Sequence, residues 1–156
     1  MFLKGLKIDK MTYIYFDYEY AVKEHDYIIF HSGGLIGAKD LGTLEATLDF
    51  VKNDMYYPEL EDKVSYLFYS INKNHSFNDG NKRSSIALSA YFLEINGLGH
   101  IASKFIELME NVAVDVADNI IDRDLLKEII TSIIYDEEYS YELKLKIITA
   151  KENKSE

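Results

Sequence analysis

At 156 residues the chain is long enough for one domain with a hydrophobic core and too short for two comfortable ones. Its formal net charge of −10 argues against non-specific binding of nucleic acid, which depends on neutralising backbone phosphates with Lys and Arg. The sequence has no cysteine, no apolar run of about 18 residues that could span a membrane and no signal-peptide pattern, so we expect a cytoplasmic protein.

The N-terminal third of the chain predicts two helices joined by a glycine-rich loop. Residues 13–16 form either a short strand or the lead-in to a helix, because periodicity cannot separate the two over so few residues. Asp17 is a suitable N-cap for a helix that ends near the pair Gly33-Gly34. Residues 34–42 contain three glycines and form the most loop-like segment, and a further helix is predicted from Thr43 to about Asn53.

Two histidines, His25 and His31, lie on the first predicted helix. Their spacing of six residues differs from the i, i+4 spacing with which a helix presents two histidines to one metal ion. We therefore expect structural roles for both.

Two neighbouring segments give the strongest helical patterns. Residues 59–74 carry an apolar stripe at positions i, i+3, i+4 and i+7, formed by Val64, Leu67, Phe68 and Ile71. After a short polar segment, a second helix opens near Gly80 and ends at Asn96-Gly97, a natural C-terminal signal. This second helix is apolar on more than one side, so we expect it to be central and well buried.

The C-terminal part predicts two amphipathic helices and then a change of pattern. The two helices lie around residues 105–116 and 126–134. From Tyr139 to Ile147 apolar and polar residues alternate with the period of a strand, which could pair with residues 13–16 in a small two-stranded sheet. Residues 149–156 are expected to form a frayed tail. The predicted fold is therefore mainly α, in a single domain of all 156 residues, with the small sheet left open.

The segment from His75 to Arg83 combines several groups that bind phosphate. A helix that begins near Gly80 presents unpaired backbone N–H groups and the positive end of its dipole, which together form an anion site. Gly80 lets a phosphate approach the backbone, and the amide of Asn81 can donate a hydrogen bond. Lys82 and Arg83 add two positive charges in an otherwise acidic chain. This pattern indicates a nucleotide-phosphate site.

Two further residues of this segment suit the chemistry of group transfer. Asp79 places a carboxylate beside the expected phosphates, and a divalent cation such as Mg²⁺ resolves that repulsion. His75 can take a proton from an attacking hydroxyl near neutral pH. A structural turn is the competing interpretation, since Asn-Asp-Gly-Asn is a common turn sequence. Basic residues in the first turn of a helix oppose its dipole, however, which favours an anion that offsets them.

The segment His-Ser-Phe-Asn-Asp-Gly-Asn-Lys-Arg resembles the signature of the Fic/Doc (Fido) family, His-Pro-Phe-x-Asp/Glu-Gly-Asn-Gly/Lys-Arg. The similarity extends over about residues 12–134 and points to the death-on-curing (Doc) branch. It includes four other segments, namely Ser32–Gly34, Gly37–Ala46, Tyr57–Leu60 and Phe92–Gly97. The resemblance implies a Fic-type helical bundle with the motif helix at its centre.

The resemblance also implies a role for each residue of the motif. His75 would be the general base and Asp79 the ligand of Mg²⁺. The phosphates of ATP, the nucleotide substrate, would be bound by four consecutive residues: Gly80, Asn81, Lys82 and Arg83. Of these, Lys82 and Arg83 would also act in catalysis by neutralising charge that develops on the phosphates.

The glycine-rich loop would be a flap against which the target protein docks. The residues of this flap that could serve the site are Gly37, Lys39 and Asp40. A structural salt bridge is an equally good interpretation of the adjacent Lys39 and Asp40.

Departures from the family signature bear on the reaction. Ser76 replaces the usual proline, a change that a loop tolerates. Lys82 stands where adenylylating Fic proteins have a second glycine, and Ile86 stands where they have a second arginine. The Doc branch shares the lysine and is similar to a protein kinase that transfers phosphate from ATP to a threonine of the elongation factor EF-Tu. The resemblance therefore favours phosphorylation. Adenylylation (AMPylation) and a nucleotide-binding regulator without catalytic activity are the alternatives.

Self-inhibiting Fic proteins carry a Ser/Thr-x-x-x-Glu-Gly/Asn motif, which this sequence lacks. Neither Glu110-Asn111 nor Glu152-Asn153 has Ser or Thr four residues before the glutamate. The resemblance therefore implies a toxin that a separate antitoxin protein restrains, with a disordered tail in an apolar groove.

Overall fold

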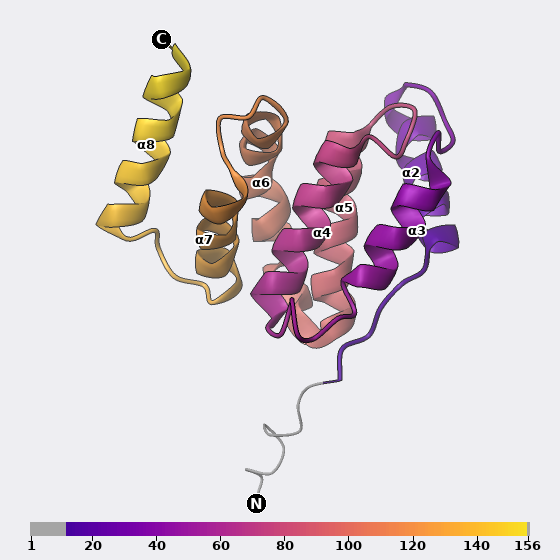
Figure 1. Ribbon diagram of the computed structural model, residues 1–156, viewed down its shortest axis with the longest axis horizontal. Helices are drawn as coiled ribbons and strands as arrows, with labels where there is room; N and C mark the ends of the chain where they lie inside the picture. Colours follow the sequence, from indigo (N-terminus) through magenta and orange to yellow (C-terminus); the bar gives the residue numbers. More distant parts are fainter. Residues whose placement is uncertain (1–11, 156) are drawn as a thin grey trace, which may run out of the picture.

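The computed structural model describes residues 12–155, and its regular structure in that range is helical (Figure 1). In chain order the helices are α2 (Tyr18–Ser32), α3 (Leu41–Phe50), α4 (Leu60–Asn74), α5 (Asn81–Leu93), α6 (Ala102–Ala117), α7 (Arg123–Ile134) and α8 (Tyr141–Ser155). A π-helical turn (Glu94–Leu98) and a 3-10 turn (Gly99–Ile101) connect α5 to α6. None of the helices described is long and apolar enough to cross a membrane.

Helices α4 and α5 form the centre of the bundle, as predicted. In Figure 1, α2 and α3 lie on one side of this pair, and α6, α7 and α8 lie on the other. The predicted stripe of α4 is buried: Val64, Leu67, Phe68 and Ile71. Helix α5 buries residues on more than one side, among them Ser84, Leu88 and Ala90. Helices pack on both sides of α5 and enclose most of it. Its first turn, which carries Lys82, remains at the surface.

Side-chain caps begin α2 and α3 next to the glycine-rich loop. Asp17 accepts a hydrogen bond from the backbone N–H of Tyr20, which confirms it as the first N-cap. Helix α2 ends at Gly33, whose φ of +90° favours glycine. Asp40 caps α3 by accepting from the backbone N–H of Thr43 at 3.0 Å and from its hydroxyl at 2.6 Å. The loop between α2 and α3 is therefore held at both ends by helix termini.

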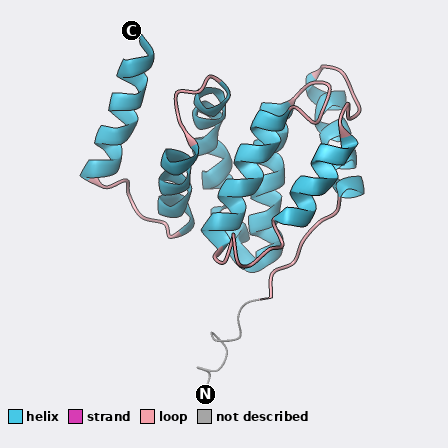
Figure 2. Cartoon of the chain, in the orientation of Figure 1, coloured by secondary structure: helices cyan, strands magenta, loops and turns pink. Residues whose placement is uncertain are grey.

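The predicted strand over residues 139–147 is wrong, because these residues enter a helix (Figure 2). The hydroxyl of Ser140 accepts from the backbone N–H of Leu143 and starts α8. The other half of the predicted sheet, residues 13–16, is neither helix nor strand and pairs with no strand among residues 12–155. Instead, the side-chain amide of Asn96 bonds the backbone of Ile14, accepting from its N–H at 2.8 Å and donating to its carbonyl at 3.0 Å.

The alternation that suggested a strand reflects a helix with two apolar faces. Leu143, Ile147 and Ala150 recur at helical spacing and pack on the core, whereas Leu145 remains exposed. Ion pairs with earlier helices hold α8 in place, including that of Lys146 with Glu128 at 2.8 Å. The helix continues to Ser155, so residues 149–155 of the segment expected to fray are helical, and Glu156 lies outside the described residues.

Candidate active site

The predicted phosphate-binding segment forms a tight loop between α4 and α5. Helix α4 ends at Asn74, and His75 follows in the left-handed conformation with a φ of +53°. Residues other than glycine seldom adopt this conformation, and those that do concentrate at functional sites. The His75 side chain is exposed, whereas Phe77 is 0% exposed and anchors the loop in the core. The imidazole of His75 is thus accessible to a substrate, as a general base must be.

Helix α5 begins with N–H groups that the helix itself does not use. Its N-cap, Gly80, has a φ of +73° and no side chain that could accept from them. The first helical hydrogen bond runs from Ser84 N to Gly80 O, which leaves the N–H groups of residues 81–83 free of it. Lys82 is exposed beside them. These are the groups for which the sequence predicts an anion site, and their binding of an anion stays a prediction.

Arg83 is partly buried and is anchored at the C-terminal end of α2. Its guanidinium donates to the hydroxyl of Ser32 and to the carbonyl oxygen of Gly33, the latter at 3.2 Å. Both partners lie about 50 residues earlier in the chain, at 51 and 50 positions. The tertiary structure thus holds one cation of the motif at the edge of the glycine-rich loop.

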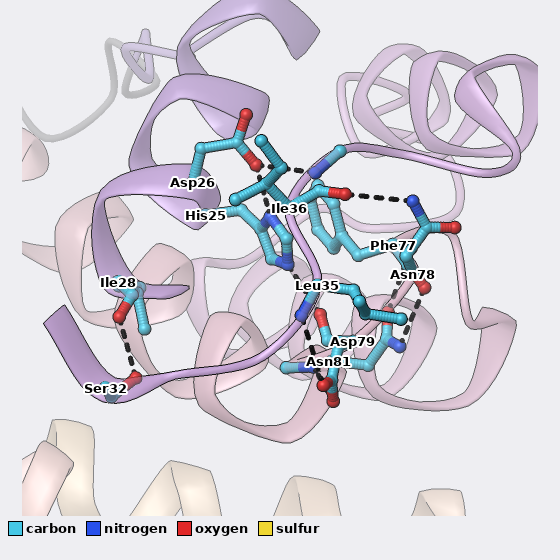
Figure 3. Close-up of polar contacts among 12 residues, drawn as sticks. His25, Asp26, Ile28, Ser32, Leu35, Ile36, Phe77, Asn78, Asp79 and Asn81 are labelled. Atoms are coloured by element: carbon cyan, nitrogen blue, oxygen red, sulfur yellow. Dashed lines mark hydrogen bonds and ion pairs between the residues drawn. The ribbon is translucent and has the colours of Figure 1, made fainter. Parts of the chain in front are cut away.

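The carboxylate of Asp79 lies between the start of α5 and the flap (Figure 3). Its Oδ1 accepts from the N–H of Gly80 at 2.8 Å, and its Oδ2 accepts more weakly from the N–H of Leu35 at 3.4 Å. A Cβ at Gly34 would approach Oδ2 to 2.7 Å. The flap backbone therefore comes so close to this carboxylate that only glycine fits there without displacement.

Asn81 closes the motif loop in this structure. Its Oδ1 accepts from the N–H of Phe77 at 3.1 Å, and its Nδ2 donates to the carbonyl oxygen of Phe77 at 3.2 Å. An amide nitrogen carries two hydrogens, so one donor of Asn81 is still free for a phosphate oxygen. Its predicted phosphate contact stays a prediction.

The glycine-rich loop, predicted over residues 34–42, spans residues 33–40 because α3 already begins at Leu41, and it lies alongside the motif loop. Ala38 and Phe77 form an antiparallel bridge. The carbonyl of Ser76 accepts from the N–H groups of Lys39 and Asp40, at 2.8 and 3.1 Å, and Asn78 N donates to Gly37 O at 3.1 Å. The structure therefore brings the predicted flap residues to the site through their backbones. The side chain of Lys39 is exposed, and that of Asp40 caps α3.

His25 and Asp26 belong to this site, although the sequence assigned them no part in it. His25 is 0% exposed, stacks on Phe77 and bonds both Asp26 and the carbonyl oxygen of Asp79. Burial by itself would raise the pKa of Asp26, but hydrogen bonds from Gly37 and His25 and the attraction of His25 hold it below its usual value. The adjacency of His and Asp about two turns before the glycine pair is the only signal in the sequence.

Mg²⁺ fits the donors at this site when nucleotide phosphates complete its shell. Among residues 12–155 there is no cluster of three acidic, histidine or cysteine side chains that could enclose a metal ion. Mg²⁺ is commonly held by one or two carboxylates together with substrate phosphates and water. Asp79 keeps lone pairs beyond its two backbone hydrogen bonds, and it sits beside the anion site. It is the residue that would hold the ion.

A family model described as "Fic/DOC family" matches residues 15–93, a little over half of the chain. The chain belongs to the Fic/DOC family. The matched range contains the flap, the motif loop and helices α2 to α5, so the family assignment covers every residue of the site described above. The Fic-type helical bundle expected from the sequence is thereby confirmed.

This Fic/DOC protein is similar to two proteins whose names state a function. The chain is 34% identical over 96 residues to "Toxin Doc" of Mycolicibacterium smegmatis. The matched region covers 59% of this chain and 74% of the relative. It is 34% identical over 84 residues to "Protein kinase doc" of Escherichia phage P1, which covers 51% of this chain and 66% of the relative. Both similarities agree with the Doc branch indicated by the sequence.

Proposed function

We propose that this chain is a Doc-type toxin and a protein kinase, which transfers a phosphate from ATP to a serine or threonine hydroxyl of a target protein. The observation that carries the proposal is the grouping of an exposed imidazole, a carboxylate and an uncapped helix N-terminus with two cations in one short segment. The residues concerned are His75, Asp79, Gly80, Lys82 and Arg83. The names of the two relatives, one a toxin and the other a protein kinase, support it.

In the proposed reaction the hydroxyl oxygen of the target forms a bond to the γ-phosphorus of ATP, and His75 takes the proton of that hydroxyl. The bond from that phosphorus to the bridging oxygen breaks, and ADP leaves. Asp79 would hold Mg²⁺, which supplies neutralising charge to the phosphates when bound. The free N–H groups at the start of α5, with Lys82 and Arg83, stabilise charge on the phosphoryl oxygens.

The choice of phosphorylation over adenylylation rests on Lys82 and Ile86. Lys82 adds a flexible ammonium at the mouth of the anion site, where a glycine would leave room for the backbone alone. Ile86 lies one turn further along α5 and adds no guanidinium to the cradle. We take these differences to favour the terminal phosphate as the group transferred.

The decisive test is transfer of label from ATP to protein with Mg²⁺ present. Label from [γ-³²P]ATP should appear in the target, and label from [α-³²P]ATP should not. Transfer of the α-label would show a nucleotidyltransferase instead, and binding of ATP without transfer of either label would show a nucleotide-binding regulator. His75→Ala, folded as judged by circular dichroism, should abolish both the transfer and growth inhibition. A toxic His75→Ala variant would contradict the assigned base.

We further propose EF-Tu as the first target to examine, an antitoxin protein as the restraining partner, and the cytoplasm as the place of action. The resemblance to the Doc branch supports all three. Incubation with purified EF-Tu followed by mass spectrometry should locate a phosphothreonine, and unmodified EF-Tu would redirect the search to a lysate. Coexpression with the product of a small neighbouring reading frame should relieve growth inhibition.

A further inference from the structure

A partly buried hydrogen-bond network lies behind the motif loop and centres on His25, which is buried, and Asp26, which is partly exposed, both of α2. His25 is 0% exposed, and its ring stacks on Phe77 with 4.0 Å between ring centroids and 4° between ring planes. A buried polar ring needs a hydrogen-bond partner at each nitrogen. Both partners of His25 connect it to the site: Asp79 belongs to the motif loop, and Asp26 is bonded to the flap residue Gly37.

One carboxylate oxygen joins α2 to the flap and, through the imidazole, to the motif loop (Figure 3). Nε2 of His25 lies 2.5 Å from the carbonyl oxygen of Asp79, and Nδ1 lies 2.9 Å from Oδ1 of Asp26. Each ring nitrogen thus faces an oxygen that can accept a hydrogen bond. The same Oδ1 of Asp26 accepts from the N–H of Gly37 at 2.8 Å. Removing that oxygen would release the flap and the imidazole together.

The contact with Asp79 acts on the start of α5. The carbonyl of Asp79 belongs to the same planar peptide unit as the N–H of Gly80, so holding one fixes the direction of the other. That N–H donates to Oδ1 of Asp79 at 2.8 Å. A Cβ at Gly80 would lie 3.5 Å from Nε2 of His25, so the ring rests against the turn where α5 begins. The network therefore bears on both the carboxylate and the anion site.

We propose that His25 and Asp26 are positioning residues for the phosphotransfer reaction. Together they hold the Asp79–Gly80 peptide and the flap in one arrangement, so that Mg²⁺-nucleotide and the target meet a preformed site. Neither side chain touches the reacting atoms, and each acts through Asp79 or through Gly37. This inference rests on the proposed function for its kinetic part alone, because the arrangement itself can be measured without catalysis.

Matched variants separate the shared oxygen from burial and charge. Asp26→Asn keeps an oxygen that can accept from both donors, whereas Asp26→Ala removes it. His25→Phe keeps a flat ring on Phe77 but removes both hydrogen bonds. Lys23→Ala changes an exposed side chain of the same helix and serves as the control. Should His25→Phe fail to fold, the two Asp26 variants decide the question.

The first measurement is amide hydrogen exchange by NMR in the protein without nucleotide. Asp26→Ala should exchange the Gly37 amide about tenfold faster or more, since it loses a hydrogen bond to a charged acceptor. Asp26→Ala and His25→Phe should both speed exchange at Leu35, whose amide bonds Asp79. The Lys39 amide, bonded directly to Ser76, is the internal reference.

The second measurement is Mg²⁺-ADP affinity by calorimetry, followed by kinetics. Loss of a group that positions a metal ligand commonly costs about 10-fold to 100-fold in metal affinity or activity, and Asp26→Ala should fall in that range. The affinity and activity of Asp26→Asn should stay near those of the wild type. In Asp26→Ala, KM for the target should rise by a larger factor than that by which kcat falls.

Two results would overturn the inference. In the first, Asp26→Ala and Lys23→Ala have equal amide exchange rates at Gly37 and Leu35 and equal affinities for Mg²⁺-ADP. The second is Asp26→Asn as impaired as Asp26→Ala, which would rule out the shared oxygen as the link. A wild-type protein that transfers no phosphate would instead refute the proposed function, and the exchange experiment would still test the network.

Discussion

Gly34→Ala tests how closely the flap must approach Asp79. Gly34 has a φ of +126°, and an added Cβ would lie 2.7 Å from Oδ2 of Asp79 and 3.1 Å from Cδ1 of Ile29. The carboxylate cannot simply turn away, because backbone N–H groups of Gly80 and Leu35 bond its two oxygens. The methyl group must therefore push the flap outward or break at least one of these hydrogen bonds.

Gly33→Ala is the matched control for this variant. Gly33 has a φ of +90°, so alanine is strained there too, but nothing lies within 4 Å of the added Cβ. Strain of this kind costs about 1–3 kcal/mol at either position. Gly34→Ala should lose about a further 1–3 kcal/mol, the cost of a hydrogen bond to a charged group. Urea denaturation followed by circular dichroism measures both differences.

The same pair should separate in phosphate transfer. Displacing a catalytic group by about 1 Å can cost on the order of 100-fold in rate, so Gly34→Ala should be strongly impaired. Gly33→Ala should stay close to the wild type once its lower stability is allowed for. Equal stability and equal transfer in the two variants would refute the inference that the flap backbone packs against the Asp79 carboxylate.

Three further substitutions test the parts of the fold that hold the site. Phe77→Ala should destabilise the protein by about 3–5 kcal/mol in urea denaturation, because it empties a fully buried site under the motif loop; a change below about 1 kcal/mol would contradict that anchoring role. Lys73→Met should cost about 1–3 kcal/mol, since Nζ donates to Asn119 Oδ1 at 2.5 Å and to two carbonyls at the end of α6; an unchanged urea midpoint would show that these bonds add nothing. Asp40→Asn should lower stability at neutral pH. Hydrogen bonds from the hydroxyl and the N–H of Thr43 lower the pKa of Asp40, so this stabilisation is present above the unfolded pKa and is lost as pH falls through the folded one. The wild type and Asp40→Asn should therefore converge in acid, and a gap that widens there would contradict the assigned cap.

The central helix pair and the motif loop could be predicted because their determinants are local. The α4 stripe recurs at helical spacing, and the residues from His75 to Arg83 are contiguous, so one short segment carries the proposed base, the carboxylate and the proposed anion site. Gly80 is the N-cap of α5, close to the predicted start of that helix, and its positive φ suits glycine. The family assignment confirmed the fold that this segment implied.

Residues distant in sequence decided the rest. The alternating pattern of 139–147 fits a strand and a two-faced helix equally well, and packing of Leu143 on the core, with the Ser140 cap, selected the helix. His25 reaches Asp79 across 54 positions, and no local rule relates the two. A hydrogen bond between residues so far apart forms only when packing brings α2 against the start of α5. The reactive groups of the motif are therefore determined by contiguous residues. The contacts that hold the motif loop against the flap form only in the folded bundle.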